Sequence, residues 1–104
     1  MIPARDCATM AELRRQIDLL DDQIVAMLTR RAGYIDRAVE LKQIEDLPAR
    51  IETRVEEVVD NVRARATDAG LDPDLTETLW RHLIDWSIAR EESVLGAGDQ
   101  GDKQ

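Results

Sequence analysis

Two cations, Arg31 and Lys42, stand on the apolar side of a predicted helix, where aliphatic side chains are expected. They are eleven residues apart, so on a helix they point within roughly 20° of each other and lie about 16 Å apart along the axis. A buried cation is costly without an anion, and the guanidinium fork of an arginine can bind both oxygens of a carboxylate. This spacing therefore indicates a site for a small anionic ligand.

A third cation, Arg14, lies near the same side of the helix. It precedes Arg31 by seventeen residues, roughly 26 Å along a helix axis, which is too far for both arginines to reach one ligand within a chain. Arg14 could reach the site of a second chain if two such helices pack antiparallel. An arginine on a helix seam can also set the register or pair with a buried carboxylate, and the spacing alone leaves both interpretations open.

The helix that carries these cations is predicted over residues 9–45. Thr9 is a suitable N-cap with Glu12 as its capping-box partner, and Pro48 ends the helix. Its seam positions alternate in steps of three and four, as in a heptad pattern. The apolar ones are Met10, Leu13, Ile17, Leu20, Ile24, Met27, Tyr34, Ala38 and Leu41, and Arg31 stands between Met27 and Tyr34. A chain of 104 residues cannot cover a helix about 55 Å long with its remaining helices. We therefore expect a homodimer.

Two further helices are predicted after this one. The first covers about 50–69, and Gly70 suits the position after its end. The second covers about 73–95, where Asp72 can cap the helix and Pro73 suits its first position. The fold class is therefore all-α, with one long and two shorter helices. The expected organisation is a leader over 1–8, a helical domain over 9–95 and a disordered tail over 96–104.

The composition excludes several classes of function. A formal net charge of −8 argues against sequence-independent nucleic-acid binding, which needs a basic surface. One cysteine and one histidine leave little material for a disulfide, a thiolate metal site or a nucleophilic triad. The chain shows no signal-peptide core and no apolar run of membrane-spanning length. We expect a cytoplasmic protein without a cofactor, a metal, a nucleic-acid partner or a membrane partner.

The segment LRRQIDLLDDQIVAMLTRRAGYIDRAVELK resembles the first helix of the all-helical chorismate mutase family, whose fold the isochorismate–pyruvate lyases share. The pattern is an Arg, then xIDxxDxxIVxxLxxR, then a Lys eleven residues after the second Arg. The resemblance covers about 6–95. It implies an intertwined helical homodimer with two equivalent sites, no cofactor, and a cyclohexadiene dicarboxylate as substrate, either chorismate or isochorismate.

The resemblance also assigns the cations. Arg31 and Lys42 would hold the substrate within one protomer, and Arg14 would cross to the site of the other protomer. In the second helix, Arg54 is the best match for a carboxylate-binding arginine of the family. The loop before this helix carries an extra residue, so Arg50 competes with Arg54 for that role.

In the third helix, the segment LIDWSIAREES places Ser87 and Glu91 at substrate-contacting positions of the family. Lys42 and Glu91 would then donate to the ether oxygen that becomes negative as its bond breaks. A carboxyl group donates only when protonated, so activity should fall as the pH rises toward neutrality and beyond. The alternatives are a solvated helix-face charge for Glu91 and a bond from Ser87 to its own helix backbone.

One departure from the mutase pattern bears on the reaction. Val55 follows Arg54, where typical mutases carry a Glu that contacts the substrate hydroxyl, and the lyases have an apolar residue there. The serine at position 87, in contrast, resembles the mutase pattern. We predict a chorismate mutase, an isomerase that forms prephenate, with Arg31, Lys42 and Glu91 as catalytic residues. The alternative is an isochorismate–pyruvate lyase that forms salicylate, and a second alternative is a non-catalytic helical dimerisation module.

Overall fold

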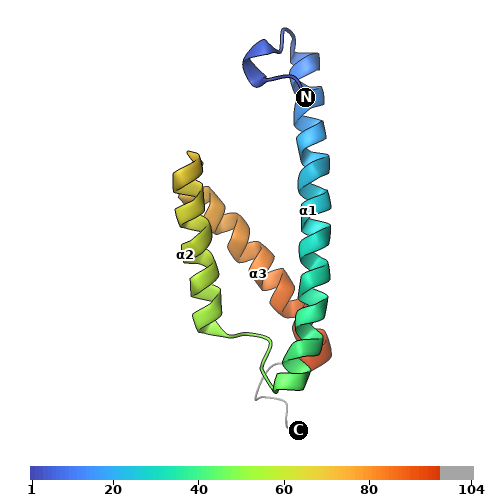
Figure 1. The fold of residues 1–104 in the computed structure, drawn as a ribbon, viewed down its shortest axis with the longest axis vertical. Helices are drawn as coiled ribbons and strands as arrows, with labels where there is room; N and C mark the ends of the chain where they lie inside the picture. The colour runs from blue at the N-terminus through green and yellow to red at the C-terminus, as the bar shows by residue number, and fades with distance from the viewer. Residues whose placement is uncertain (97–104) are drawn as a thin grey trace. The chain divides into compact units, whose positions relative to one another are not determined.

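The computed structural model describes residues 1–96, which are helical throughout apart from short connections (Figure 1). The elements are the 3-10 turn η1 (Ala4–Asp6) and the helices α1 (Met10–Glu45), α2 (Glu52–Ala69) and α3 (Pro73–Leu95). None of these residues forms a strand, so the all-α prediction is confirmed. The second helix begins two residues later than predicted, at Glu52. From residue 97 on, the predicted disordered tail lies outside the described residues.

The helix ends carry the caps that the sequence predicts. Thr9 Oγ1 accepts the backbone N–H of Glu12 at 3.1 Å, and the Glu12 carboxylate accepts the N–H of Ala8 at 3.1 Å, so the side chains satisfy two otherwise unpaired donors. Asp72 caps α3 by accepting the N–H two residues on at 2.9 Å. Gly70 ends α2 with a φ of 78°, a left-handed conformation that glycine adopts without a steric penalty.

The chain divides into two compact units, Met1–Tyr34 and the residues from Ile35 onward. In the first unit, the segment that contains η1 is tied to α1, because the N–H of Ile2 donates to Gln16 Oε1 at 3.0 Å. The apolar seam of α1 in this unit is exposed; Ile17, Leu20, Ile24 and Met27 keep between 45% and 61% of their surface in contact with solvent. This unit therefore has a seam but no core around it.

The second unit contains the core of the chain. Helices α2 and α3 run in opposite directions (Figure 1) and enclose an apolar cluster with the loop that precedes α2. Its buried members are Ala49, Val55, Val59, Ile84 and Ile88. Burial of a Val or Ile side chain stabilises a fold by about 1.5–3 kcal/mol, so this cluster holds the two helices together.

Ion pairs at the surface add to the contact between α2 and α3. Arg63 of α2 bonds to Asp74 and Glu77 of α3, at 3.0 and 2.8 Å. Arg81 of α3 bonds to Glu77 in its own helix at 2.7 Å and to Glu56 of α2 at 3.2 Å. Within residues 1–96, no helix has both the length and the apolar character needed to cross a membrane.

Candidate active site

Lys42, near the end of α1, and Glu91, near the end of α3, meet in the second unit. Lys42 Nζ donates to Glu91 Oε1 at 2.5 Å and to the carbonyl oxygen of Ala49 at 2.6 Å. The Glu91 side chain is only 5% exposed and that of Lys42 is 19% exposed. The structure thus brings together two predicted catalytic residues that lie 49 positions apart in the sequence.

The local structure explains why these two groups face each other. On α3, Ile84, Ser87, Ile88 and Glu91 are all buried, and this spacing of three and four places them on one side of the helix. That side faces the apolar core, so Glu91 enters the core edge with its neighbours. The loop after α1 brings the buried carbonyl of Ala49 to the Lys42 ammonium, which receives a second acceptor there.

The pair is an unusual combination of charge and burial. Removing a carboxylate and an ammonium from water costs several kcal/mol per ion, which their attraction offsets only when the geometry is good. An apolar pair of the same volume would often be equally stable at such a position. The arrangement places an ammonium donor beside a carboxyl group at the edge of an apolar cluster. A ligand oxygen at this point could accept from Lys42, and from Glu91 when that carboxyl is protonated.

Ser87 lies one helical turn before Glu91 on the same side of α3 and is buried. Its Oγ donates to the carbonyl oxygen of Leu83 at 2.8 Å, the backbone bond that the sequence allowed as an alternative. A serine in a helix commonly makes this bond to the residue four positions earlier.

The two candidate arginines of the second unit bond to carboxylates at the surface. Arg54 is 63% exposed and donates to Glu57 at 2.6 Å. Arg50 donates to Glu52 at 2.8 Å and to Asp85 of α3 at 3.1 Å. The structure does not bring either guanidinium to the Lys42–Glu91 pair. Exposed pairs of this kind contribute roughly 0.2–1 kcal/mol, so an arginine can exchange its partner for a ligand carboxylate at small cost.

The remaining predicted site residues, Arg14 and Arg31, lie on α1 in the first unit. Arg14 is exposed and Arg31 is half-buried. Their roles toward a ligand stay predictions.

Two residues that sequence reasoning did not single out lie close to the pair. Arg90 of α3 donates from Nε and Nη2 to the two carboxylate oxygens of Asp36 in α1, at 2.6 and 3.0 Å. Its guanidinium also lies 5.4 Å from the ring centre of Trp86. The hydrogen bonds from Arg90 hold the pKa of the Asp36 carboxyl below its ordinary value. No periodicity or motif in the sequence marks this contact between residues 54 positions apart.

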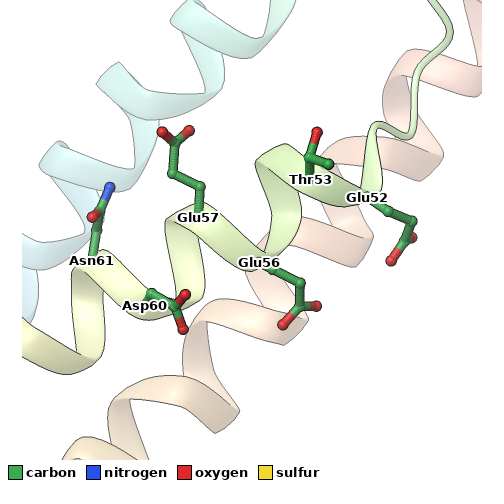
Figure 2. Close-up of a pocket in the computed structure, with 6 residues that line it drawn as sticks. All are labelled: Glu52, Thr53, Glu56, Glu57, Asp60 and Asn61. Atoms are coloured by element: carbon green, nitrogen blue, oxygen red, sulfur yellow. The ribbon is translucent and has the colours of Figure 1, made fainter.

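A concave surface of a different character lies along α2 (Figure 2). It has a volume of about 580 Å³ and is lined by Glu52, Thr53, Glu56, Glu57, Asp60 and Asn61. Four carboxylates repel an anionic ligand, so this hollow does not suit the predicted substrate. Among residues 1–96, no group of three or more His, Cys, Asp and Glu side chains has an arrangement that could hold a metal ion.

Comparisons with known proteins point to one family. The family described as "Chorismate mutase type II" matches residues 13–92, a span that contains most of α1, all of α2 and most of α3. A protein named isochorismate pyruvate lyase, from Pseudomonas aeruginosa, is 36% identical over 90 residues, which cover 83% of this chain and 84% of that protein. No solved structure gives a significant match to the chain.

Proposed function

The chain belongs to the chorismate mutase type II family, and from this premise we propose that it rearranges chorismate to prephenate. The observation that carries the proposal is the buried contact between Lys42 and Glu91. It places an ammonium and a carboxyl group where one ligand oxygen could be contacted by both. Together with the family, this arrangement favours a reaction in which negative charge develops on a single oxygen.

The reaction needs no nucleophile and no redox partner from the protein. The ether C–O bond between the ring and the enolpyruvyl group breaks, and a C–C bond forms between the enolpyruvyl methylene carbon and the ring. Electrons move within the substrate only. The protein therefore contributes by holding the reactive conformer and by stabilising the transition state more than the ground state. In this proposal Lys42 donates to the ether oxygen as negative charge develops on it.

Glu91 is the second donor in this proposal. In the free protein its carboxylate accepts from Lys42; in the complex the ether oxygen takes the place of that carboxylate, and Glu91 donates as a protonated carboxyl group. An ionised Glu91 would repel a dicarboxylate.

The substrate carboxylates would be held by arginines. We assign Arg31 and Arg54 of one protomer and Arg14 of the other to this role, with Arg50 as the alternative to Arg54 and Ser87 as a further polar contact. The exposed pair between Arg54 and Glu57 supports the assignment, because such a pair is easily exchanged.

A homodimer is part of the proposal, because Arg14 acts on the site of the other chain. The exposed seam of α1 supports it; the residues concerned are Ile17, Leu20, Ile24 and Met27. A contiguous apolar surface of this kind on a small chain is typical of a protein–protein interface. Since the same helix presents the seam in every copy, a two-fold symmetric pair of α1 helices would cover it.

Removal of pyruvate from isochorismate is the second candidate. It is favoured by the relative named isochorismate pyruvate lyase and by Val55, which is buried in the apolar cluster and offers no polar contact to a substrate hydroxyl. In that reaction the same type of ether bond breaks while a hydrogen moves from the ring to the enolpyruvyl methylene carbon, and salicylate and pyruvate result. Lys42 would serve the same leaving oxygen.

One pair of assays separates these functions. Purified protein is incubated with chorismate and, separately, with isochorismate, and prephenate and salicylate are measured. Prephenate from chorismate supports the mutase, and salicylate from isochorismate supports the lyase. If neither product forms, the chain is a non-catalytic dimerisation module, and Arg31→Leu should then leave the protein folded or stabilise it.

A further inference from the structure

A second ion pair joins α1 to α3 close to the proposed catalytic pair. Asp36 and Arg90 make two parallel hydrogen bonds, at 2.6 and 3.0 Å, and a bidentate pair fixes orientation as well as distance. The ring of Trp86, one turn earlier on α3, lies 5.4 Å from the guanidinium. A cation over an aromatic face is attracted to it, so the ring restricts the positions that the guanidinium can take.

The two pairs hold α3 from different directions. Arg90 and Glu91 are consecutive in a helix and therefore point about 100° apart. On α1, Asp36 precedes Lys42 by six residues, which places their side chains about 120° apart around the axis and about 9 Å apart along it. One pair alone restrains the rotation of α3 against α1 from a single direction only. Two pairs in different directions fix that rotation.

During the proposed reaction only one of these pairs remains available to hold the helices. The contact between Lys42 and Glu91 must open, because both groups turn to the ether oxygen of the substrate. The contact between Asp36 and Arg90 lies at the surface, with the two side chains 52% and 46% exposed, and no step of the reaction uses it.

We propose that Asp36 and Arg90 are positioning residues that keep Glu91 facing Lys42 while the substrate oxygen lies between them. The proposal rests on the proposed function. A displacement of about 1 Å in a catalytic group can lower a rate up to a hundredfold. A loosened α3 should thus affect the rate constant more than substrate binding, which arginines elsewhere would maintain.

The chain supplies a matched control in the pair between Arg81 and Glu56. This pair also joins α3 to another helix, α2, and its side chains are similarly exposed, at 42% and 56%. Neither residue bonds to Lys42 or Glu91 or is a neighbour of them in sequence. Arg81→Gln removes this pair together with the bond to Glu77 in the same helix, so it should cost at least as much stability without changing the position of Glu91.

The test compares Asp36→Asn, Arg90→Gln and the double variant with Arg81→Gln. We expect kcat to fall about tenfold in Asp36→Asn and in Arg90→Gln while KM changes less than about threefold. The kcat of the double variant should be no lower than that of either single variant, since each single variant already removes the same contact. Arg81→Gln should keep the wild-type kcat. An unchanged kcat in Asp36→Asn and Arg90→Gln, or an equal loss in Arg81→Gln, would overturn the proposal.

Arg90→Lys separates positioning from charge. A lysine keeps the positive charge beside Glu91 but has no fork for the two oxygens of Asp36. We expect this variant to recover less than about half of the lost kcat. Full recovery would show that charge alone acts and would contradict a positioning role.

A second readout does not depend on activity. The sequence contains two lysines, Lys42 and Lys103, so the acetylation of Lys42 by an amine-reactive ester can be measured by peptide mass spectrometry with Lys103 as the reference. Arg90→Gln and Asp36→Asn should raise the relative acetylation of Lys42, and Arg81→Gln should not. If the wild type forms neither prephenate nor salicylate, the proposed function fails, while unchanged labelling in both variants would sink the positioning role.

Discussion

The two parts of α1 lie in different surroundings. In Met10–Tyr34, Ile24 and Met27 are 55% and 61% exposed, and no residue of the described chain covers them fully. In Ile35–Glu45, Val39 is buried and Lys42 bonds to Glu91 and Ala49. The second part of α1 thus has buried contacts within the described residues, whereas the apolar seam of the first part is exposed among them.

This difference shows that the apolar pattern of a helix does not determine which residues pack against it. In the second part of α1, Lys42 bonds to Glu91 of α3 and to Ala49 in the loop before α2. This half of the proposed site can therefore form within one chain. The first part carries Arg14 and Arg31 beside an exposed seam, and in the proposed function a second copy of the chain completes its half of the site. The predictions below test each part separately, beginning with the largest expected effect.

The largest effect is expected from Ile24→Glu in the first part. This change places a carboxylate in the seam between the two proposed α1 helices, where an unpaired charge is costly. We expect a monomer in light scattering and an activity below about a thousandth of the wild type, since each site loses the arginine of the other chain. Ala26→Glu is the control, because a residue two positions on points about 200° away. If Ile24→Glu remains dimeric and active, the seam of α1 is not the dimer interface.

The next largest effect is expected from a change in the second part of α1. Lys42→Ala removes the donor to the ether oxygen and should lower kcat by about 10²–10³-fold, the usual loss for one donor to a developing oxyanion. The measurement is steady-state formation of prephenate, or of salicylate in the lyase case. Arg37→Ala is the control, because it removes an exposed cation of the same helix that pairs with Glu40. Equal losses in the two variants would mean that Lys42 acts through general charge rather than position.

A smaller effect is expected at Glu91, the second proposed donor. The amide of Glu91→Gln can donate to the ether oxygen, whereas Glu91→Ala carries no donor. Glu91→Gln should therefore retain more of the wild-type kcat than Glu91→Ala. The measurement is kcat for the wild type and both variants. Equal kcat values in the two variants would exclude Glu91 as a donor.

The smallest effect concerns stability in acid. The hydrogen bonds from Arg90 lower the pKa of Asp36 in the folded state, so the pair stabilises the fold above the ordinary pKa of an aspartate and loses this contribution as the pH falls through the lowered value. Asp36→Asn should therefore unfold at a lower temperature than the wild type at pH 7, and the two melting temperatures should converge toward pH 2. Arg90→Gln should behave in the same way. A difference in melting temperature that persists in strong acid would point to a cause other than the ion pair.

The sequence by itself determined the helices and their ends. Thr9, Gly70 and Asp72 act on the backbone within one turn of themselves, and the heptad steps of α1 depend on neighbours three and four residues away. Such local effects can be read without a tertiary structure, and they placed Lys42 and Glu91 on predicted helices. The family pattern then connected these residues to one site.

Only the tertiary structure decided which side chains meet. The contact of Lys42 with Glu91 spans 49 positions and that of Asp36 with Arg90 spans 54, so each depends on how α3 packs against α1 and not on any repeat in the sequence. Long-range contacts follow from the summed burial of the apolar faces, which sets the rotation of each helix, and a small change in that rotation would exchange one ion-pair partner for another.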